Sequence, residues 1–367
     1  MVISQNRHRY AVIGAAAGVF SAHRSALLAP TIELVALSDI NQQVGEQRAL
    51  ELNCAFFADY HQLLKEMHPD VVIVMTPHTL HARIAIDCLQ AGCHVLEEKP
   101  MAVQVAEADA MIEAAEEHQR LLCVIFQHRF RPDIRAIKTL LDAGRLGSIQ
   151  HIAMSAVWTR TASYYRSASW RGTWRGEGGG VLMNQAPHHL DILCHLFGLP
   201  TRVFAWNRTR MHKIKTEDTV QAMLEWENGA SGSLHISTAE ADESEYLKIV
   251  GTRGWLELRQ GKLTCQLLET DLKEFIAHEP DPFATPRMHP FEITLEAGRG
   301  DHSAVYQAFE HALTHNQPFT STGIEGRMSL ELANALIYSS HSGTSVELPL
   351  DREKYASLLS RLQSSEN

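Results

Sequence analysis

The chain has 367 residues, of which 45% are hydrophobic and 21% charged, which excludes a disordered chain and predicts two domains. Its net charge of −10 argues against a nucleic-acid binder, and no apolar stretch reaches the ~18 residues of a membrane span. The amino-terminal segment lacks the apolar core of a secretory signal. Six cysteines without paired spacing predict buried reduced thiols, and the scattered histidines predict no metal site. We therefore expect a cytoplasmic protein.

Residues 1–128 predict an α/β domain with a doubly wound parallel sheet. Short apolar runs rich in β-branched residues alternate with helical patterns, as in a Rossmann domain. The expected strands are 9–14, 32–39, 70–75, 93–98 and 121–126, and the expected helices are 19–29, 42–52, 59–67, 79–92 and 105–119.

Residues 129–367 predict a second, α+β domain with an open, mainly antiparallel sheet and helices on one face. We expect a long loop over 159–183, which is rich in Gly, Arg, Trp and Tyr. The expected helices are 132–142, about 184–197, about 303–314 and about 325–340. The expected strands are 148–158, 201–208, 219–226, 230–238, 245–251, 254–260 and 262–269.

The first strand ends in a glycine-containing turn, VIGAAAGVF, directly before a helix. Backbone N–H groups and the helix dipole at such a turn bind the pyrophosphate of a dinucleotide. Gly14 takes the first position of the GxGxxG pattern and Ala16 replaces the second glycine, so Gly18, followed by Val19, would make the close approach. An ordinary strand–turn–helix junction is the alternative.

Polar groups follow later strands at the same edge of the sheet. Asp39 ends the second strand, where an acid can bind both hydroxyls of the adenosine ribose and repel a 2′-phosphate. This favours NAD over NADP, although Asp39 could simply cap the next helix. Thr76 and Pro77 follow the run 70–75 at the edge where ligands bind, and His81 lies on the next helix unless it is a solvated surface residue.

Two groups of residues are candidates for the reaction centre. Lys99 follows the strand 93–98, where a lysine near the nicotinamide can hydrogen-bond a substrate oxygen unless it is merely solvated. Asn184, His188 and Asp191 have the spacing of one helix face. An imidazole such as His188 suits abstraction of a proton from an alcohol.

A proline and a glycine run surround the second group. Pro187 predicts that the helix begins near Ala186, which leaves Asn184 just before it. The glycines within 176–180 allow close approach of the backbone to a ligand or to a neighbouring strand.

Taken together, these motifs resemble the Gfo/Idh/MocA family, named after glucose–fructose oxidoreductase, inositol dehydrogenase and rhizopine-catabolism proteins. The match runs along nearly the whole chain, and the EKP and GGGxLxxxxxH motifs in this order are its most specific part. The matching features are the turn at 14–18, Asp39, TPxxxH at 76–81, EKP at 98–100, Arg129, GRLG at 144–147, YYRSASWRG at 164–172, GGGVLMNQAPHHLD at 178–191 and the segment GIEGRMSLELANALIYSSHSGTSVELPL.

The resemblance implies a tightly held nicotinamide cofactor and oxidation or reduction of a sugar, a cyclitol or a related carbinol. It matches Lys99 with the family lysine and His188 with the catalytic histidine, and it places Glu98 and Lys99 beside the nicotinamide ribose. Many relatives have an aspartate where this chain has Asn184, so no carboxylate polarises His188 from that position.

We therefore expect an NAD-dependent oxidoreductase in which His188 accepts the hydroxyl proton, Lys99 orients the carbinol oxygen and Asn184 orients the substrate or His188. One alternative is redox-assisted glycoside cleavage with recycled NAD, which would use the same residues. Another is a non-catalytic regulator on the same fold that binds NAD and sugar. Three further residues are assigned to substrate binding: Tyr164, Trp170 and Arg171.

The second domain also predicts assembly. In the run 219–226, Val220, Ala222 and Leu224 are expected on one face of the sheet, with Met223 and Trp226 on the other. An uncovered apolar face favours packing against a second copy. Relatives commonly assemble through this sheet, so we expect a homodimer or homotetramer held by the C-terminal sheet.

Overall fold

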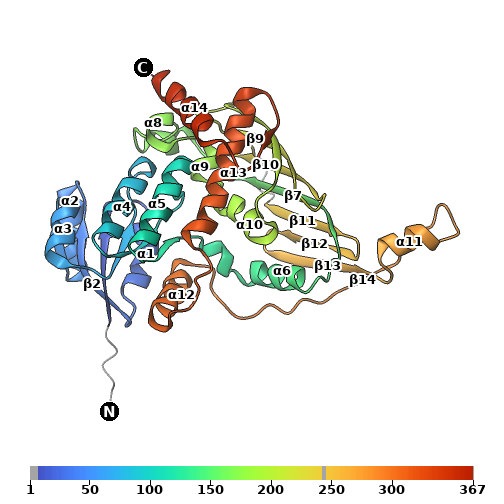
Figure 1. The fold of residues 1–367 in the computed structure, drawn as a ribbon, viewed down its shortest axis with the longest axis horizontal. Coiled ribbons are helices and arrows are strands. Elements are labelled where there is room, and N and C mark those ends of the chain that lie inside the picture. Colours follow the sequence, from blue (N-terminus) through green and yellow to red (C-terminus); the bar gives the residue numbers. More distant parts are fainter. Residues whose placement is uncertain (1–6, 242–244, 367) are drawn as a thin grey trace, which may run out of the picture. The chain divides into compact units, whose positions relative to one another are not determined.

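The computed structural model describes residues 7–241 and 245–366, which form two compact units (Figure 1). The first unit extends to Gln127 and also contains 175–178 and 301–330, and the second contains the other described residues. The domains that we expected, 1–128 and 129–367, are each continuous in sequence, whereas the chain returns to the first compact unit at 175–178 and 301–330. The backbone N–H of Val124 donates to Ser321 O, and this hydrogen bond connects 301–330 to the first sheet.

The first unit is built on a six-stranded sheet in the order β3-β2-β1-β4-β5-β6, and every neighbouring pair is parallel. This is the strand order of a Rossmann domain, as expected. Strand β3, three residues long, was not expected because so short a segment shows no periodicity. The strands are β1 His8–Ile13, β2 Ile32–Ser38, β3 Ala55–Phe57, β4 Val71–Val74, β5 His94–Glu97 and β6 Leu122–Val124.

Helices follow the strands of the first unit at the predicted places. Polar caps define several starts, since Asn41, Asp59 and Asp301 each accept a backbone N–H at a helix N-terminus. The helices are α1 Phe20–Leu27, α2 Gln42–Leu52, α3 Tyr60–Met67, the 3-10 helix η1 His78–Leu80, α4 His81–Gln90, α5 Val105–Glu117 and α12 His302–His315.

The second unit contains a nine-stranded mixed sheet in the order β14-β13-β12-β11-β7-β10-β9-β8-β15. Strands β7 and β10 pair in parallel, whereas the other neighbouring pairs are antiparallel, which confirms the open, mainly antiparallel sheet. The short strands β14 and β15 extend it at its two edges and were not expected. The strands are β7 Ile149–Val157, β8 Arg202–Arg208, β9 Thr219–Glu225, β10 Ser231–Ser237, β11 Tyr246–Gly251, β12 Gly254–Arg259, β13 Lys262–Leu268, β14 Met288–Pro290 and β15 Val346–Glu347.

The expected loop over 159–183 is wrong in part, because it contains three short helical turns that its Gly, Arg and aromatic residues had concealed. The helix expected from about 184 begins at Pro187 with Ala186 as its N-cap, as the proline predicted. Helices α11 and α14 were not expected. The remaining helices are η2 Gln127–Phe130, α6 Pro132–Asp142, α7 Ala162–Arg166, α8 Trp174–Glu177, α9 Val181–Asn184, α10 Pro187–Phe197, α11 Leu272–His278, α13 Gly323–Ser342 and α14 Arg352–Ser364.

The faces of the second sheet alternate in burial. Val220, Ala222 and Leu224 are buried, whereas Met223 is 51% exposed. The expectation that Trp226 shares the face of Met223 is wrong. Trp226 lies two residues after Leu224, so it has the parity of the buried residues, and its indole Nε1 donates to Gly198 O at 3.0 Å. Trp206, on the neighbouring strand β8, shares the face of Met223 and is 50% exposed.

Five of the six cysteines are buried and Cys54 is partly buried, and all six are free thiols. Within 7–241 and 245–366, no helix combines the length and the apolar character needed to cross a bilayer.

Candidate dinucleotide and substrate site

The turn after β1 fits tightly between the two neighbouring strands. Gly14 has a φ of +95°, and a Cβ there would lie 2.7 Å from the carbonyl carbon of Met75 at the end of β4. On the other side, Gly14 N–H and Ala15 N–H both donate to Ser38 O, at 2.9 and 3.1 Å. Glycine is therefore required at position 14 for both the backbone conformation and the close approach.

Asp39 is bound to this turn. Its carboxylate accepts the Ala16 N–H at 2.6 Å and the Asn41 N–H at 2.7 Å, so the Ala16 N–H is already used within the unit. Among the described residues, the backbone N–H groups of Gly18 and Val19 donate to no partner. They lie directly before α1, where free N–H groups and the helix dipole favour an anion.

A cation also lies at this turn. The guanidinium of Arg48 binds the carbonyl oxygens of Ala15 and Ala17 and lies 4.5 Å from the centroid of the Phe20 ring. From the sequence, Arg48 is recognisable only as the first basic residue after Asp39. Its contact with the turn could not be predicted, because it depends on how α2 packs.

The polar residues after β4 are buried rather than solvated. His78 and His81 are 8% and 1% exposed, so the alternative of surface histidines is wrong. The ring of His81 lies between two loops, with Nε2 2.7 Å from Thr76 O and Nδ1 2.8 Å from Pro100 O. His81 therefore connects the loops that follow β4 and β5. Burial lowers the pKa of His81, although the two carbonyl partners oppose that effect.

Thr76 adds an unused polar atom at this edge. Its hydroxyl Oγ1 is buried and has no hydrogen-bond partner among the described residues. A buried hydroxyl without a partner is costly unless a ligand or water satisfies it. Together with the free N–H groups of Gly18 and Val19, it fits the hydrogen-bonding groups of a dinucleotide at the carboxyl end of the sheet.

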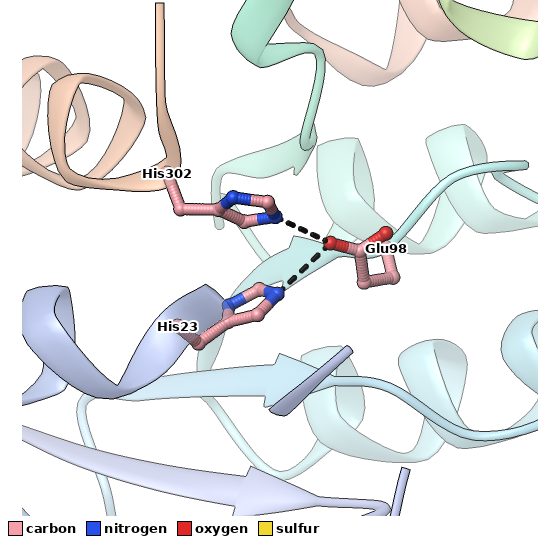
Figure 2. A group of neighbouring side chains, drawn as sticks. All are labelled: His23, Glu98 and His302. Atoms are coloured by element: carbon pink, nitrogen blue, oxygen red, sulfur yellow. Dashed lines mark hydrogen bonds and ion pairs between the residues drawn. The ribbon is translucent and has the colours of Figure 1, made fainter. Parts of the chain in front are cut away.

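The turn after β5 carries Glu98 and Lys99. Two histidine rings converge on Glu98 Oε1, with His23 Nε2 at 2.9 Å and His302 Nε2 at 3.3 Å (Figure 2). The backbone N–H of Lys99 donates to Glu98 Oε2 at 3.1 Å. Burial alone raises the pKa of Glu98, but the hydrogen bonds from the two histidines outweigh it and hold that pKa well below its usual range.

Both carboxylate oxygens of Glu98, which we expected beside the nicotinamide ribose, therefore accept hydrogen bonds from within the protein. Within the described residues, His23, Glu98 and His302 are also the group of side chains suited to hold a metal ion. The sequence does not reveal this group, because its members come from α1, the turn after β5 and the start of α12 (Figure 2).

In the second unit, His188 lies on the first turn of α10 and is partly exposed. Its ring stacks on His128, with centroids 4.5 Å apart and 29° between the planes. Burial lowers the pKa of His128 to about 4, so His128 is neutral at neutral pH. Sequence reasoning missed His128, since it lies in the connection between β6 and α6, where no periodic pattern marks it.

A buried ion pair fixes the helix that carries His188. Arg129 Nη2 and Nε lie 2.6 and 2.8 Å from the two carboxylate oxygens of Asp191, and both side chains are almost fully buried. Asn184 ends the separate helix α9, so it does not share a continuous helix with His188 and Asp191.

The glycine run approaches a neighbouring segment, one of the two expected possibilities. A Cβ on Gly180 would lie 1.9 Å from Glu217 O. The Glu217 carboxylate accepts the N–H groups of Gly180 and Leu182 at 2.9 and 3.1 Å. This contact fixes the start of α9, which carries Asn184.

The three residues assigned to substrate binding lie together. Arg171 lies 4.5 Å from the ring centroids of both Tyr164 and Trp170, and it donates to the Tyr164 hydroxyl at 2.7 Å. Gln185, next to Asn184, donates to the same hydroxyl at 2.9 Å. The chain thus places an aromatic and amide cluster directly beside α9. Lys99 belongs to the first unit, whereas His188 and this cluster belong to the second.

The strand order and the glycine turn define a dinucleotide-binding Rossmann protein with a second domain on a large open sheet. Residues 8–126 match the family model described as the oxidoreductase family with an NAD-binding Rossmann fold, and residues 134–257 match the GFO/IDH/MocA C-terminal domain. The chain belongs to the Gfo/Idh/MocA family of oxidoreductases, as its motifs indicated.

Curated relatives are similar over part of the chain. The 1-carboxy-3-chloro-3,4-dihydroxycyclohexa-1,5-diene dehydrogenase of Comamonas testosteroni is 31% identical over 56% of this chain and 52% of its own length. The D-glucoside 3-dehydrogenase of Escherichia coli K12 is 30% identical over 60% of this chain and 62% of its own length. The aligned part thus spans about half to two thirds of these relatives.

A solved structure is similar over nearly the whole chain. The WlbA dehydrogenase of Bordetella pertussis, solved with NADH and UDP-GlcNAcA, has a TM-score of 0.80 and 27% identity, covering 94% of this chain and 100% of that one. A levoglucosan dehydrogenase solved with NADH and levoglucosan has a TM-score of 0.78 and 20% identity, covering 94% and 100%, and shares the fold.

Proposed function

We propose that the protein is an NAD-dependent dehydrogenase that transfers a hydride between nicotinamide and a secondary carbinol of a sugar, glycoside or cyclitol. The observation that carries this proposal is the turn of Gly14 to Val19, whose free N–H groups lie before α1 in a member of an oxidoreductase family. The names of the relatives support carbinol substrates, since they include a glucoside dehydrogenase and a scyllo-inositol dehydrogenase.

The chain supplies proton transfer and orientation. The N–H groups of Gly18 and Val19 would hold the pyrophosphate of NAD⁺, and the cofactor would supply the hydride acceptor for oxidation of the carbinol to a carbonyl. His188 accepts the hydroxyl proton at its imidazole, while neutral His128 stacks against it. Lys99 donates a hydrogen bond to the same oxygen and stabilises its developing negative charge. Asn184 orients the substrate or His188.

Asp39 and the turn select the cofactor in this proposal. The Asp39 carboxylate can accept hydrogen bonds from the hydroxyls of the adenosine ribose and disfavour a 2′-phosphate. The WlbA structure contains NADH, which agrees with this choice. The scyllo-inositol 2-dehydrogenase of Bacillus subtilis, 33% identical over 43% of this chain and 43% of its own length, is named for NADP⁺. We assign NAD because Arg48, the cation at this turn, already binds two backbone carbonyls.

Tyr164, Trp170 and Arg171 form the sugar-binding surface in this proposal. An aromatic face packs against the C–H groups of a sugar ring, while the hydroxyl and the guanidinium bond its hydroxyl groups. The arrangement is rigid because Arg171 lies against both rings and Gln185 holds the Tyr164 hydroxyl.

A screen of the purified protein tests the proposal. NAD is supplied with pyranosides, glycosides and inositols, and NADH is supplied with their keto forms, while absorbance and products are followed. We expect a keto product formed together with NADH. A cleaved glycoside without net NADH would identify redox-assisted cleavage instead, and tight binding of NAD and sugar without any product would identify a regulator.

We also propose that the protein assembles through the open face of its second sheet, as a dimer or tetramer, and that it is cytoplasmic. Exposed Trp206 and Met223 lie on neighbouring strands of that face, and Phe204 stands opposite Met223 in the β8–β9 pair. The free thiols agree with a reducing compartment.

A further inference from the structure

Three side chains far apart in sequence meet in the interior of the first unit. Figure 2 shows the rings of His23 and His302 pointing at the same carboxylate oxygen of Glu98. We propose that His23, Glu98 and His302 bind a divalent first-row transition ion, with Zn²⁺ as the representative case. This proposal does not depend on the dehydrogenase activity.

The donor set is the first argument. Two imidazole nitrogens and one carboxylate oxygen are ligands that zinc and its neighbours prefer, and His₂Glu with one open position is an established zinc arrangement. All three side chains are buried, and their donor atoms lie within 4.8 Å of one another. Burial excludes most of the water that would compete for the ion.

The distances are the second argument. Metal–ligand bonds of about 2.0–2.2 Å in a tetrahedral site separate the ligand atoms by about 3.3–3.5 Å. In the structure, Glu98 Oε1 lies 2.9 Å from His23 Nε2 and 3.3 Å from His302 Nε2. The Glu98 oxygen therefore needs to separate from the two rings by at most a few tenths of an ångström to admit an ion, and the two ring nitrogens lie within 4.8 Å of each other.

Further hydrogen bonds hold the proposed ligands in place. His23 Nδ1 lies 2.9 Å from the Tyr306 hydroxyl, so a proton on Nδ1 would leave Nε2 free for the metal. Glu98 Oε2 is fixed by the Lys99 N–H, which aims Oε1 at the two rings. The ring centroids of His23 and His302 are 4.3 Å apart, so the two ligands already pack against each other.

The ion would join three elements. His23 belongs to α1, Glu98 to the turn after β5 and His302 to the first turn of α12. A metal bond between them would fasten 301–330 to the sheet of the same unit, and it would offset the buried charge of Glu98 next to Lys99. Because binding requires the folded arrangement, occupancy raises the melting temperature.

Metal binding measured on the full-length protein tests the proposal. The protein is treated with a chelator, and Co²⁺ is titrated while its visible absorption is followed; Zn²⁺ is then added in competition. We expect one tight site per chain with the spectrum of a low-coordinate N/O site, displaced by Zn²⁺, together with a rise in melting temperature.

His302→Gln is the decisive variant, because glutamine retains an N–H donor for Glu98 but removes the imidazole ligand. We expect at least about 100-fold weaker Co²⁺ binding in this variant. The matched control is the double variant His311→Ala/His315→Ala. These exposed residues lie on the same helix with ring centroids 4.5 Å apart and the planes tilted by 50°, and they form a surface histidine pair. This control should keep the tight site.

Two results would overturn the proposal. If the wild type binds Co²⁺ no more tightly than His302→Gln, the cluster is a hydrogen-bonded triad only. If the tight ion disappears in the His311/His315 variant, the surface pair is the site. X-ray absorption of the zinc-loaded wild type gives a measurement independent of variants, and it should show two imidazole ligands.

Discussion

His188 and Lys99 are the residues on which the proposed chemistry rests. We expect His188→Ala and Lys99→Ala each to lower kcat by about 10²–10⁴, since each removes proton transfer or charge stabilisation in the transition state. NAD binding and folding should be nearly unchanged. His195→Gln, two turns further along α10, is the matched control and should keep its turnover. Near-normal kcat in a folded His188 or Lys99 variant removes that residue from the mechanism.

Asp39 is the residue that we expect to determine the preference for NAD over NADP. We expect the wild type to have a higher kcat/KM with NAD than with NADP, because the carboxylate repels a 2′-phosphate. Asp39→Ser should reduce this ratio at least about tenfold, by removing the charge while keeping an acceptor for the Ala16 N–H. Initial rates with both cofactors measure it. A wild type that prefers NADP, or an unchanged ratio in the variant, places Asp39 outside the ribose pocket.

The positions of some functional residues could be predicted from the sequence, whereas their contacts with distant segments could not. Gly14, Asp39 and His188 stand at fixed places relative to strands and helices, so their positions could be predicted. The stacking of His128 on His188 and the meeting of His23 with His302 could not, because each depends on how distant segments pack. No local pattern records such contacts.

At the scale of the element, α10 depends on the pair of Arg129 and Asp191. We expect Arg129→Leu to destabilise the protein by about 3–5 kcal/mol, because it leaves a buried carboxylate without its partner. The double variant Arg129→Leu/Asp191→Leu should recover much of that loss, since no buried charge remains. Urea denaturation of the two variants measures the difference. A double variant as unstable as the single one would show that packing rather than charge is responsible.

The elements themselves were predictable where they were long and periodic. The strands of the first unit are buried on both faces and rich in β-branched residues, so their runs stand out in the sequence. Strands β3, β14 and β15 have three residues or fewer, and pairing with a neighbour rather than periodicity defines them. The helical turns within 159–183 escaped for the same reason.

For the whole molecule, buried neutral histidines predict a loss of stability in acid. Burial lowers the pKa of His94 from 6.5 to about 4, and its Nδ1 accepts the Leu121 N–H at 2.9 Å. Below pH 6.5 the unfolded chain binds this proton and the folded chain does not, so stability falls as the pH drops from 6.5 toward 4. Each such histidine contributes a slope of up to about 1.4 kcal/mol per pH unit.

Burial also lowers the pKa values of His128 and His195 to about 4, so these residues contribute to the same loss of stability between pH 6.5 and 4. We expect His94→Asn to lower the slope of unfolding free energy against pH by up to one proton, since asparagine can accept the Leu121 N–H without titrating. Denaturant unfolding at several pH values from 4 to 7 measures the slope. An unchanged slope would show that His94 titrates normally in the folded protein.

The second sheet has an exposed apolar face through which we expect copies of the chain to associate. One face packs its apolar side chains inside the unit, whereas Trp206 and Met223 are 50% and 51% exposed on the other. Trp206 also contacts Phe204, with ring centroids 4.8 Å apart, so the apolar side chains are contiguous there. Burying such a patch against a second copy is favourable, and two-fold symmetry is the simplest closed arrangement.

We expect light scattering at micromolar concentration to give an even multiple of the chain mass of 41.0 kDa. Trp206→Glu combined with Met223→Lys should shift the protein toward monomer, because both charges would have to be desolvated in the interface. Ser360→Glu, at an exposed position of helix α14 outside the sheet, serves as the control for added charge. A wild type that remains at 41.0 kDa as its concentration rises would show that this face does not associate.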